Sequence, residues 1–220
     1  MQTNFTAEQL QDTHVAEAER ILRKCVHCGF CTATCPTFTL LGDELDSPRG
    51  RIYLIKDMLE NGRPADDKIV KHIDRCLSCL ACMTTCPSGV HYMHLVDHAR
   101  IHIEKTYKRP LADRIMRSVL AFVLPYPKRF RLALFGAFFG RPLAGALKAL
   151  GGPLARVGAM LELAPAKAPG RGELEGPGVF APEAPKRKGR VALLSGCAQP
   201  VLKPGINEAA IRLLTRLGVE

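Results

Sequence analysis

Eight of the nine cysteines in this 220-residue chain stand in two runs of identical spacing, and no other feature restricts the fold as strongly. Each run reads Cys-x2-Cys-x2-Cys-x3-Cys-Pro; the first spans 25–36 and the second spans 76–87, so the pattern repeats after 51 residues. The polar start of the chain predicts no signal peptide and therefore a reducing cytoplasm. In that compartment, dense thiols indicate metal binding rather than a disulfide framework.

The spacing within each run predicts [4Fe–4S] clusters. Two intervening residues allow a tight loop to direct successive sulfurs at different corners of one cube. The fourth cysteine follows a longer step, and in two-cluster ferredoxins it binds the other cluster. Zinc is the alternative, but a zinc site takes four ligands in two pairs, and these runs lack that pattern. We therefore predict two clusters with crossed ligands: Cys25, Cys28, Cys31 and Cys86 for the first, and Cys76, Cys79, Cys82 and Cys35 for the second.

Apolar residues of helical period surround both cysteine runs. They predict helices over 6–24, from Ser47-Pro48 to Asn61-Gly62, from Asp66 toward the second run, and over 90–106. This order predicts a mainly α fold. Residues 1–110 would form a helical ferredoxin domain with two similar motifs, at about 15–46 and 66–96.

The composition changes after this region. Residues 111–163 predict a basic amphipathic helical segment, and residues 164–189 hold five Pro and five Gly, which predicts a linker. Residues 190–195 predict a buried strand and residues 206–217 a helix, together one β-α unit. Because a lone unit leaves its strand edges unpaired, we expect the chain to stop inside an incomplete α/β domain.

Positive charge is concentrated between Arg100 and Leu150, where 11 Lys and Arg face 2 Asp and Glu. This predicts an acidic partner or an anionic membrane surface. It argues against nucleic acid, because the basic and aromatic residues do not alternate. The nine-residue apolar run 132–140 is shorter than the ~20 residues that span a bilayer. Four phenylalanines here either pack against protein or lie in a membrane interface: Phe130, Phe135, Phe138 and Phe139.

Other candidate residues carry weaker signals. Four histidines share a predicted helix face, as a metal site, a proton relay or an ordinary polar face: His91, His94, His98 and His102. Cys197 is either a buried apolar residue or an additional ligand whose partners are missing. No dinucleotide or phosphate fingerprint and no paired base and nucleophile stand out, so we expect no catalytic residues.

Three stretches carry a resemblance to a known family: CVHCGFCTATCPT at 25–37, LLGDELDSPRGRIYLIK at 40–56 and GCAQP at 196–200. The chain resembles the iron–sulfur subunit of bacterial glycolate oxidase (glycolate dehydrogenase) along almost its whole length. The cysteine runs alone are shared by many relatives, so the 40–56 stretch is the specific part. In that family a cysteine-rich domain with Cys-Cys-Gly motifs follows the position of Cys197, and this chain ends at Glu220 without those motifs.

The resemblance implies an electron-transfer subunit without catalytic residues in an oxidoreductase complex. Separate FAD-binding subunits would oxidise glycolate to glyoxylate, and this chain would pass electrons toward a membrane quinone or similar acceptor. The location implied is the cytoplasm, peripheral on the cytoplasmic face of the inner membrane. Alternatives are the same role beside a lactate or glycerol 3-phosphate dehydrogenase or in a heterodisulfide-reductase-like complex, a nucleic-acid-binding iron–sulfur protein, and a purely structural cluster protein.

Overall fold

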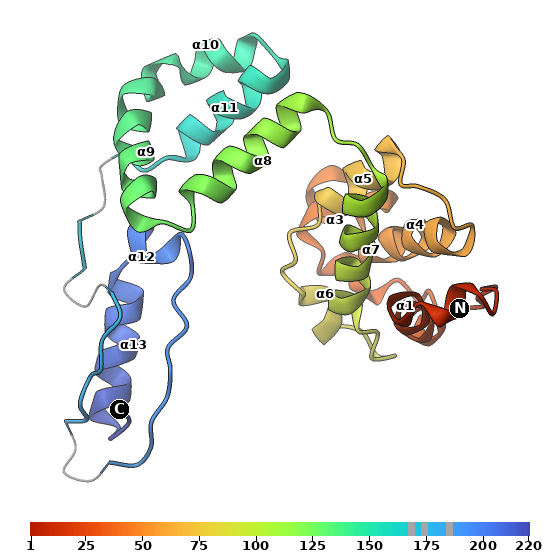
Figure 1. Cartoon of the computed structure of the whole chain (residues 1–220), viewed down its shortest axis with the longest axis horizontal. Helices are drawn as coiled ribbons and strands as arrows, with labels where there is room; N and C mark the ends of the chain where they lie inside the picture. The colour runs from red at the N-terminus through yellow and green to blue at the C-terminus, as the bar shows by residue number, and fades with distance from the viewer. Residues whose placement is uncertain (167–169, 173–175, 184–186) are drawn as a thin grey trace. The chain divides into compact units, whose positions relative to one another are not determined.

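The computed structural model describes residues 1–166, 170–172, 176–183 and 187–220. The chain divides into two compact units, Met1–Lys108 and Arg109–Glu220, and each is treated by itself. Both are built from helices, so the predicted mainly α fold is confirmed (Figure 1).

The first unit contains the two cysteine runs on a helical frame. Its elements, in order, are η1 (Gln9–Gln11), α1 (Thr13–Lys24), α2 (Phe30–Ala33), α3 (Pro36–Leu41), η2 (Glu44–Asp46), α4 (Pro48–Glu60), α5 (Asp67–Asp74), α6 (Ala81–Thr84) and α7 (Tyr92–Thr106). The one-turn helices α2 and α6 lie inside the two runs and contact each other. The predicted order of helices and cysteine loops is therefore present.

Side-chain caps explain where the long helices begin. The Ser47 hydroxyl accepts a hydrogen bond from the Gly50 amide, and the Asp66 carboxylate accepts one from the Ile69 amide. Both starts were predicted, because Ser and Asp satisfy the free amides of a first turn. The predicted start of the first helix at residue 6 is wrong: Asp12 caps α1, which begins at Thr13.

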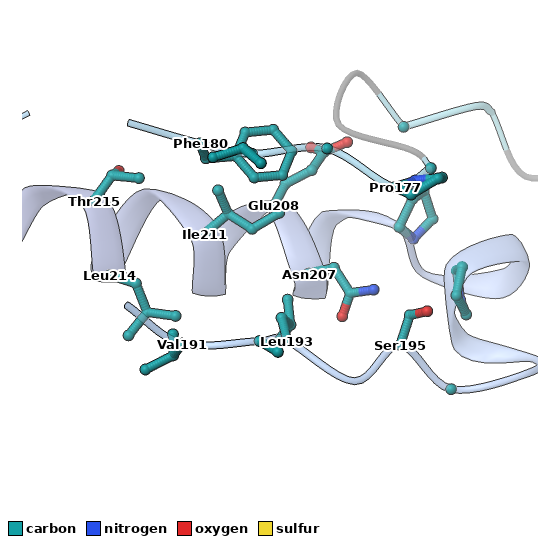
Figure 2. A pocket seen from close by; sticks show the side chains of 18 of the residues that line it. Pro177, Phe180, Val191, Leu193, Ser195, Asn207, Glu208, Ile211, Leu214 and Thr215 are labelled. Atoms are coloured by element: carbon teal, nitrogen blue, oxygen red, sulfur yellow. The ribbon is translucent and has the colours of Figure 1, made fainter. Parts of the chain in front are cut away.

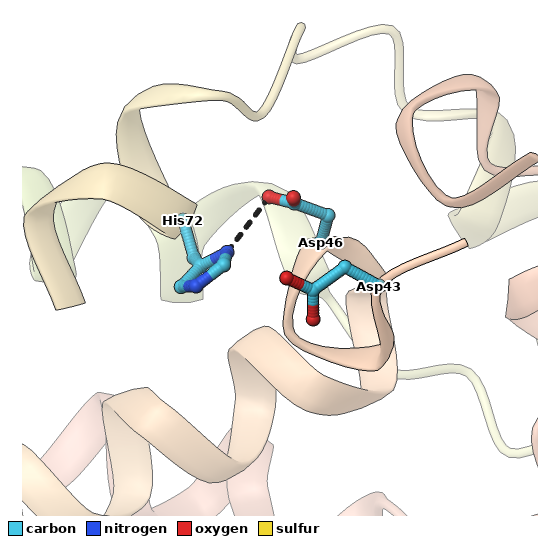
Figure 3. Close-up of side chains that lie close together, drawn as sticks. All are labelled: Asp43, Asp46 and His72. Carbon is cyan, nitrogen blue, oxygen red and sulfur yellow. Dashed lines mark hydrogen bonds and ion pairs between the residues drawn. The ribbon is translucent and has the colours of Figure 1, made fainter. Parts of the chain in front are cut away.

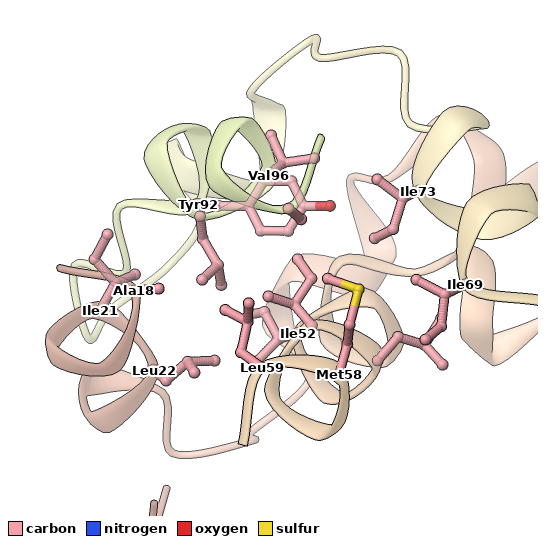
Figure 4. Packing of buried hydrophobic residues seen from close by; sticks show 14 of the residues in the cluster. Ala18, Ile21, Leu22, Ile52, Met58, Leu59, Ile69, Ile73, Tyr92 and Val96 are labelled. Carbon is pink, nitrogen blue, oxygen red and sulfur yellow. The ribbon is translucent and has the colours of Figure 1, made fainter. Parts of the chain in front are cut away.

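A single apolar core holds the first unit together. Buried residues of α1, α4, α5 and α7 point toward one another in Figure 4, with Leu22, Met58, Ile73 and Val96 each at most 1% exposed. Burying one such side chain contributes about 1.5–3 kcal/mol. Cys25 and Cys82 belong to the same buried cluster, so the core reaches the cysteine loops and positions them.

The second unit is a series of helices with few buried side chains. Its elements are α8 (Leu111–Val123), α9 (Pro127–Gly140), η3 (Arg141–Leu143), α10 (Ala144–Ala149), α11 (Gly152–Leu163), α12 (Gln199–Leu202) and α13 (Gly205–Arg216). Helices α10 and α11 form a hairpin in which Gly158 lies against the backbone of Ala144 and the side chain of Lys148. Lys148 also forms an ion pair with Glu162 at 2.8 Å.

The predicted strand over 190–195 does not form. Residues 190–196 have no regular secondary structure, and a single parallel bridge joins Gly189 to Val219. The Val191 amide donates to the Glu220 carbonyl at 2.9 Å. In the described part of the chain, the backbone hydrogen bonds between 188–191 and 218–220 join Lys188 to Gly218, Gly189 to Glu220 and Val191 to Glu220, which is too few to build a regular ladder. The predicted helix over 206–217 is confirmed as α13.

Parts of the predicted linker 164–189 lie outside the described residues, namely 167–169, 173–175 and 184–186. The apolar segment before it is longer than the nine-residue run suggested. Residues Pro127–Ala149 form 23 consecutive helical residues that are apolar and long enough, by length and composition, to cross a membrane. Only 11% of the most apolar window is buried within the structure.

Candidate iron–sulfur site

Two small cavities open among the cysteine loops of the first unit. The cysteines that line the first are Cys25, Cys28, Cys31, Cys82 and Cys86, and those that line the second are Cys35, Cys76, Cys79 and Cys82. Each cavity therefore combines three cysteines of one run with the fourth cysteine of the other. Cys82 and Tyr92 line both cavities, so the two share a wall.

The two cysteine loops have the same backbone conformation at equivalent positions. His27 and Gly29 in the first loop have φ of 58° and 86°, and Ser78 and Leu80 in the second have φ of 51° and 60°. These are equivalent positions, separated by the 51-residue repeat. A non-glycine residue in the left-handed region costs about 1–2 kcal/mol. Alternating left-handed residues curl the backbone into concave arrays of N–H groups, a geometry that suits an anionic cluster.

The thiols are crowded in a way that disfavours their charged form without a metal. Burial raises the pKa of Cys82 to about 12, and the neighbouring Cys76, Cys31, Cys35 and Cys79 add to the effect. Burial likewise raises the pKa of Cys31, with contributions from Cys25, Cys86 and Cys28. A set of thiols this close releases its protons readily only when a cation binds. Sulfur donors in this number suit iron–sulfur clusters.

Cys35 differs from Cys31 and Cys82 in the direction of its pKa shift. Burial alone would raise its pKa, but hydrogen bonds from the Thr37 hydroxyl and from the amides of Phe38 and Thr37 outweigh burial and lower the pKa. The Thr37 Oγ1 atom lies 3.2 Å from the Cys35 sulfur. Because Cys35 directly precedes α3, the first amides of that helix supply these donors. The second cavity thus contains one thiol whose deprotonation is favoured by hydrogen bonds from its neighbours.

A buried polar network, absent from the sequence predictions, borders the second cavity. Arg51 is 1% exposed and donates to the His72 carbonyl at 2.7 Å, to Thr37 Oγ1 at 3.0 Å and to Asp46 Oδ1 at 3.4 Å. Its Nη1 atom lies 3.9 Å from the Cys35 sulfur. One signal was present in the sequence, since Arg51 is spaced four residues from Ile55 on the apolar face of α4.

Asp46 is the centre of this network. His72 Nδ1 lies 2.9 Å from Asp46 Oδ1 (Figure 3). Arg75 donates to Asp46 Oδ2 at 2.7 Å. Burial would raise the pKa of Asp46, but the hydrogen bonds from His72 and Arg75 outweigh burial and lower the pKa. Asp43 lies close enough to Asp46 and His72 to suggest a cation site. Two arginines already neutralise Asp46, so the group is better described as a buried ion-pair network.

The four predicted histidines do not converge. His98 Nε2 lies 3.0 Å from Glu17 and its Nδ1 lies 3.2 Å from His14 Nδ1, whereas His102 lies 3.1 Å from the Arg63 carbonyl. His91 and His94 have ring centroids 6.3 Å apart. Within the residues that the structure describes, these histidines form no metal-binding group, so the polar-face interpretation fits best.

Cys197 lies in the second unit and is exposed. It lines an open pocket between α13 and the extended residues 190–196, with Val191 and Leu193 on the extended segment and Leu214 on the helix (Figure 2). No other cysteine lines this pocket. The predicted role of Cys197 as an additional ligand therefore gains no partner among the described residues.

Two cysteine loops with crossed cavities on a small helical frame define a class, the dicluster iron–sulfur domain. The family described as "4Fe-4S dicluster domain" matches residues 21–90. The particular resemblance predicted from the 40–56 stretch is also confirmed: the chain is similar to glycolate oxidase iron–sulfur subunits along its whole length. These relationships support an iron–sulfur electron-transfer role.

The two glycolate oxidase relatives are longer than this chain. The glycolate oxidase iron-sulfur subunit of Escherichia coli (strain K12) is 47% identical over 219 residues, which cover 100% of this chain and 49% of that protein. The probable glycolate oxidase iron-sulfur subunit of Bacillus subtilis (strain 168) is 33% identical over 90% of this chain and 46% of its own length. The chain thus spans about half the length of these curated relatives.

A more distant relative matches a shorter stretch. One of the subunits of the ferredoxin:CoB-CoM heterodisulfide reductase of Methanosarcina mazei is 30% identical over 99 residues, 44% of this chain and 55% of that protein. No solved structure matches the chain.

Proposed function

We propose that this chain is an electron-transfer subunit of a glycolate-oxidising complex. FAD-binding partner subunits oxidise glycolate to glyoxylate and deliver electrons to the first unit, which passes them toward a membrane quinone or a similar acceptor. The 47% identity to a glycolate oxidase iron-sulfur subunit over the whole chain supports this proposal more than any other observation. The chain contributes no catalytic residue; the substrate is oxidised on the partner subunits.

The two cavities are the proposed sites of two [4Fe–4S] clusters, which supply one-electron redox chemistry when bound. Cys25, Cys28, Cys31 and Cys86 hold the first cluster, and Cys76, Cys79, Cys82 and Cys35 hold the second. The cavity linings support these crossed sets. The shared wall of Cys82 and Tyr92 supports direct electron exchange, because it places the two sites next to each other. The buried Tyr92 side chain also keeps water out of that wall.

Crossed ligation is tested by Cys35→Ser. We expect this substitution to damage the cluster held mainly by the second cysteine run, because Cys35 is that cluster's fourth ligand. Mössbauer and EPR spectra of the purified variant measure which cluster is altered, and Cys86→Ser is the matched control that should alter the other. If Cys35→Ser harms only the cluster of its own run, the crossed assignment is wrong.

The electron donor is tested by anaerobic visible absorbance of the chain mixed with its candidate flavin subunits. Glycolate should bleach the broad iron–sulfur band. If the band persists with glycolate but bleaches with dithionite, the clusters are present but glycolate is not the electron donor. Lactate and glycerol 3-phosphate, added in parallel, test the other dehydrogenase partners. A preparation without the band would reject the clusters themselves.

The second unit is proposed to hold the complex at the cytoplasmic face of the inner membrane, peripherally. Phe135, Phe138 and Phe139 are each more than half exposed on α9, and the surrounding region is strongly basic. Exposed aromatic residues beside arginines suit the boundary between headgroups and acyl chains. Figure 1 shows α9 and α10 running in different directions, which favours a helix pair lying on the membrane over a straight span.

A further inference from the structure

The start of α4 lies between the two cysteine-lined cavities. Pro48 lines both of them, Arg49 lines the first and Arg51 lines the second. The first turn of a helix carries partial positive charge, so this end of α4 already favours negative charge at both sites. The two arginines add a full charge at each site, but their surroundings differ.

Arg49 is placed where its charge is weakened. A Cβ atom on Gly29 of the first loop would lie 2.7 Å from Arg49 Nη1, so the guanidinium rests against that loop. The side chain is 36% exposed and its Nε lies 2.7 Å from the Glu44 carboxylate. Water screens the charge and Glu44 offsets it.

Arg51 is placed where its charge acts strongly. It is almost fully buried, with Nη1 3.9 Å from the Cys35 sulfur. Its carboxylate partner, Asp46, also neutralises Arg75, so the three side chains together carry a surplus positive charge. A further cation is near, because Arg100 donates to the Cys76 carbonyl at 2.8 Å and to Ser78 Oγ at 2.7 Å.

We propose that Arg51, assisted by Arg100, raises the reduction potential of the cluster held by Cys35, Cys76, Cys79 and Cys82 above that of its neighbour. This inference rests on the two clusters and crossed ligands of the proposed function. Reduction adds one negative charge, and a buried cation stabilises that charge more than an exposed, paired one does. With both clusters bound, an electron would pass more favourably from the first site, which would be oxidised, to the second, which would be reduced, with no proton required.

The test is an EPR-monitored redox titration of the full chain carrying its clusters. The wild type should show two unequal potentials. Arg51→Gln should lower the equilibrium constant for reduction of the higher-potential cluster at least tenfold. For a one-electron couple this is a reduction potential about 59 mV lower. Arg51→Lys, which keeps the charge, should recover most of the reduction potential that Arg51→Gln loses. Arg49→Gln should shift the other cluster by less, and Arg20→Gln, a surface control on α1, should shift neither.

Cys35→Ser identifies which signal belongs to which cluster, because it should alter the higher-potential one. Arg100→Gln provides a second variant should Arg51→Gln fail to fold. It removes the charge of a half-buried side chain and should lower the same potential. Equal shifts of both clusters, or no shift in either arginine variant, would overturn the inference while leaving two clusters in place. A chain that binds no [4Fe–4S] cluster would instead overturn the proposed function.

Discussion

Asp46 and Arg51 are ionised side chains taken almost completely out of water. Removing an ion from water is costly, and only close partners of opposite charge and further hydrogen bonds offset the cost. The structure provides these partners through residues that are distant in the chain, since Asp46 meets His72 and Arg75 across 26 and 29 residues. Losing Asp46 leaves Arg51 buried without its carboxylate partner.

Asp46→Asn should therefore lower the free energy of unfolding by about 3–5 kcal/mol, the usual effect of breaking a buried ion pair from one side. Urea unfolding at neutral pH measures this loss. Asp43→Asn is the matched control, because Asp43 caps the Leu45 amide, and Asn caps equally well. If both variants were equally destabilised and a divalent cation stabilised the wild type, a cation site would be the better description.

The same carboxylate predicts how stability depends on pH. The folded pKa of Asp46 lies below the ordinary value of 3.8, so its stabilisation is present above that value and is lost as pH falls through the folded pKa. The stability difference between the wild type and Asp46→Asn should shrink as pH is lowered below about 4. A difference that stays constant with pH would show that Asp46 is not ionised in the folded chain.

Among the helices, α4 has the most demanding position, because its first turn packs on η2. A Cβ atom on Gly50 would overlap the Glu44 carbonyl and lie 2.9 Å from the Leu45 Cα. Backbone atoms cannot move aside as a side chain does. The absence of a side chain at Gly50 thus permits the close approach that places Arg49 and Arg51 at the two cavities.

Gly50→Ala should destabilise the first unit by about 1–3 kcal/mol, the usual cost of overpacking, and should disturb both cluster spectra. Gly136→Ala is the control: this glycine lies inside α9 with open space around it, and alanine there should be neutral or stabilising by up to about 1 kcal/mol. Thermal unfolding and EPR of the two variants give the comparison. Unchanged spectra in Gly50→Ala would show that α4 can shift without affecting the sites.

At the scale of the whole molecule, the two units differ in how much apolar surface they expose. The first unit has one continuous core, whereas the second exposes many apolar side chains, with Phe135 and Phe138 packing edge-on against Phe139. Such a surface, surrounded by arginines, indicates an interaction that covers it.

Replacing Phe138 and Phe139 by Ser should weaken binding of the full chain to anionic phospholipid vesicles by at least about tenfold. Inserting two phenyl groups into the acyl region of the membrane contributes well over about 1.4 kcal/mol of binding free energy. Vesicle co-sedimentation measures the binding, and the iron content should not change. The control replaces Leu40 and Leu41, which are also exposed but lie on α3 of the first unit. Equal loss in both variants would assign no special role to α9.

Local rules in the chain were enough to anticipate much of this protein. The spacing of the cysteine runs indicated the donor sets, and the caps at Ser47 and Asp66 and the helix that became α13 follow from interactions within three or four residues. Such interactions are the same wherever the segment lies, so a pattern reveals them. The 40–56 stretch identified the relatives, although its physical role could not be read from it.

What the chain alone did not reveal depends on contacts between distant residues. The strand expected over 190–195 needed neighbouring strands, and the described part of the chain supplies one bridge at Val219. Asp46 and Arg51 read as ordinary surface charges until packing of α4 against α5 buries them beside Cys35. Burial and long-range pairing determine whether a charge is screened by water or acts on a redox site, and both arise only when the chain is folded.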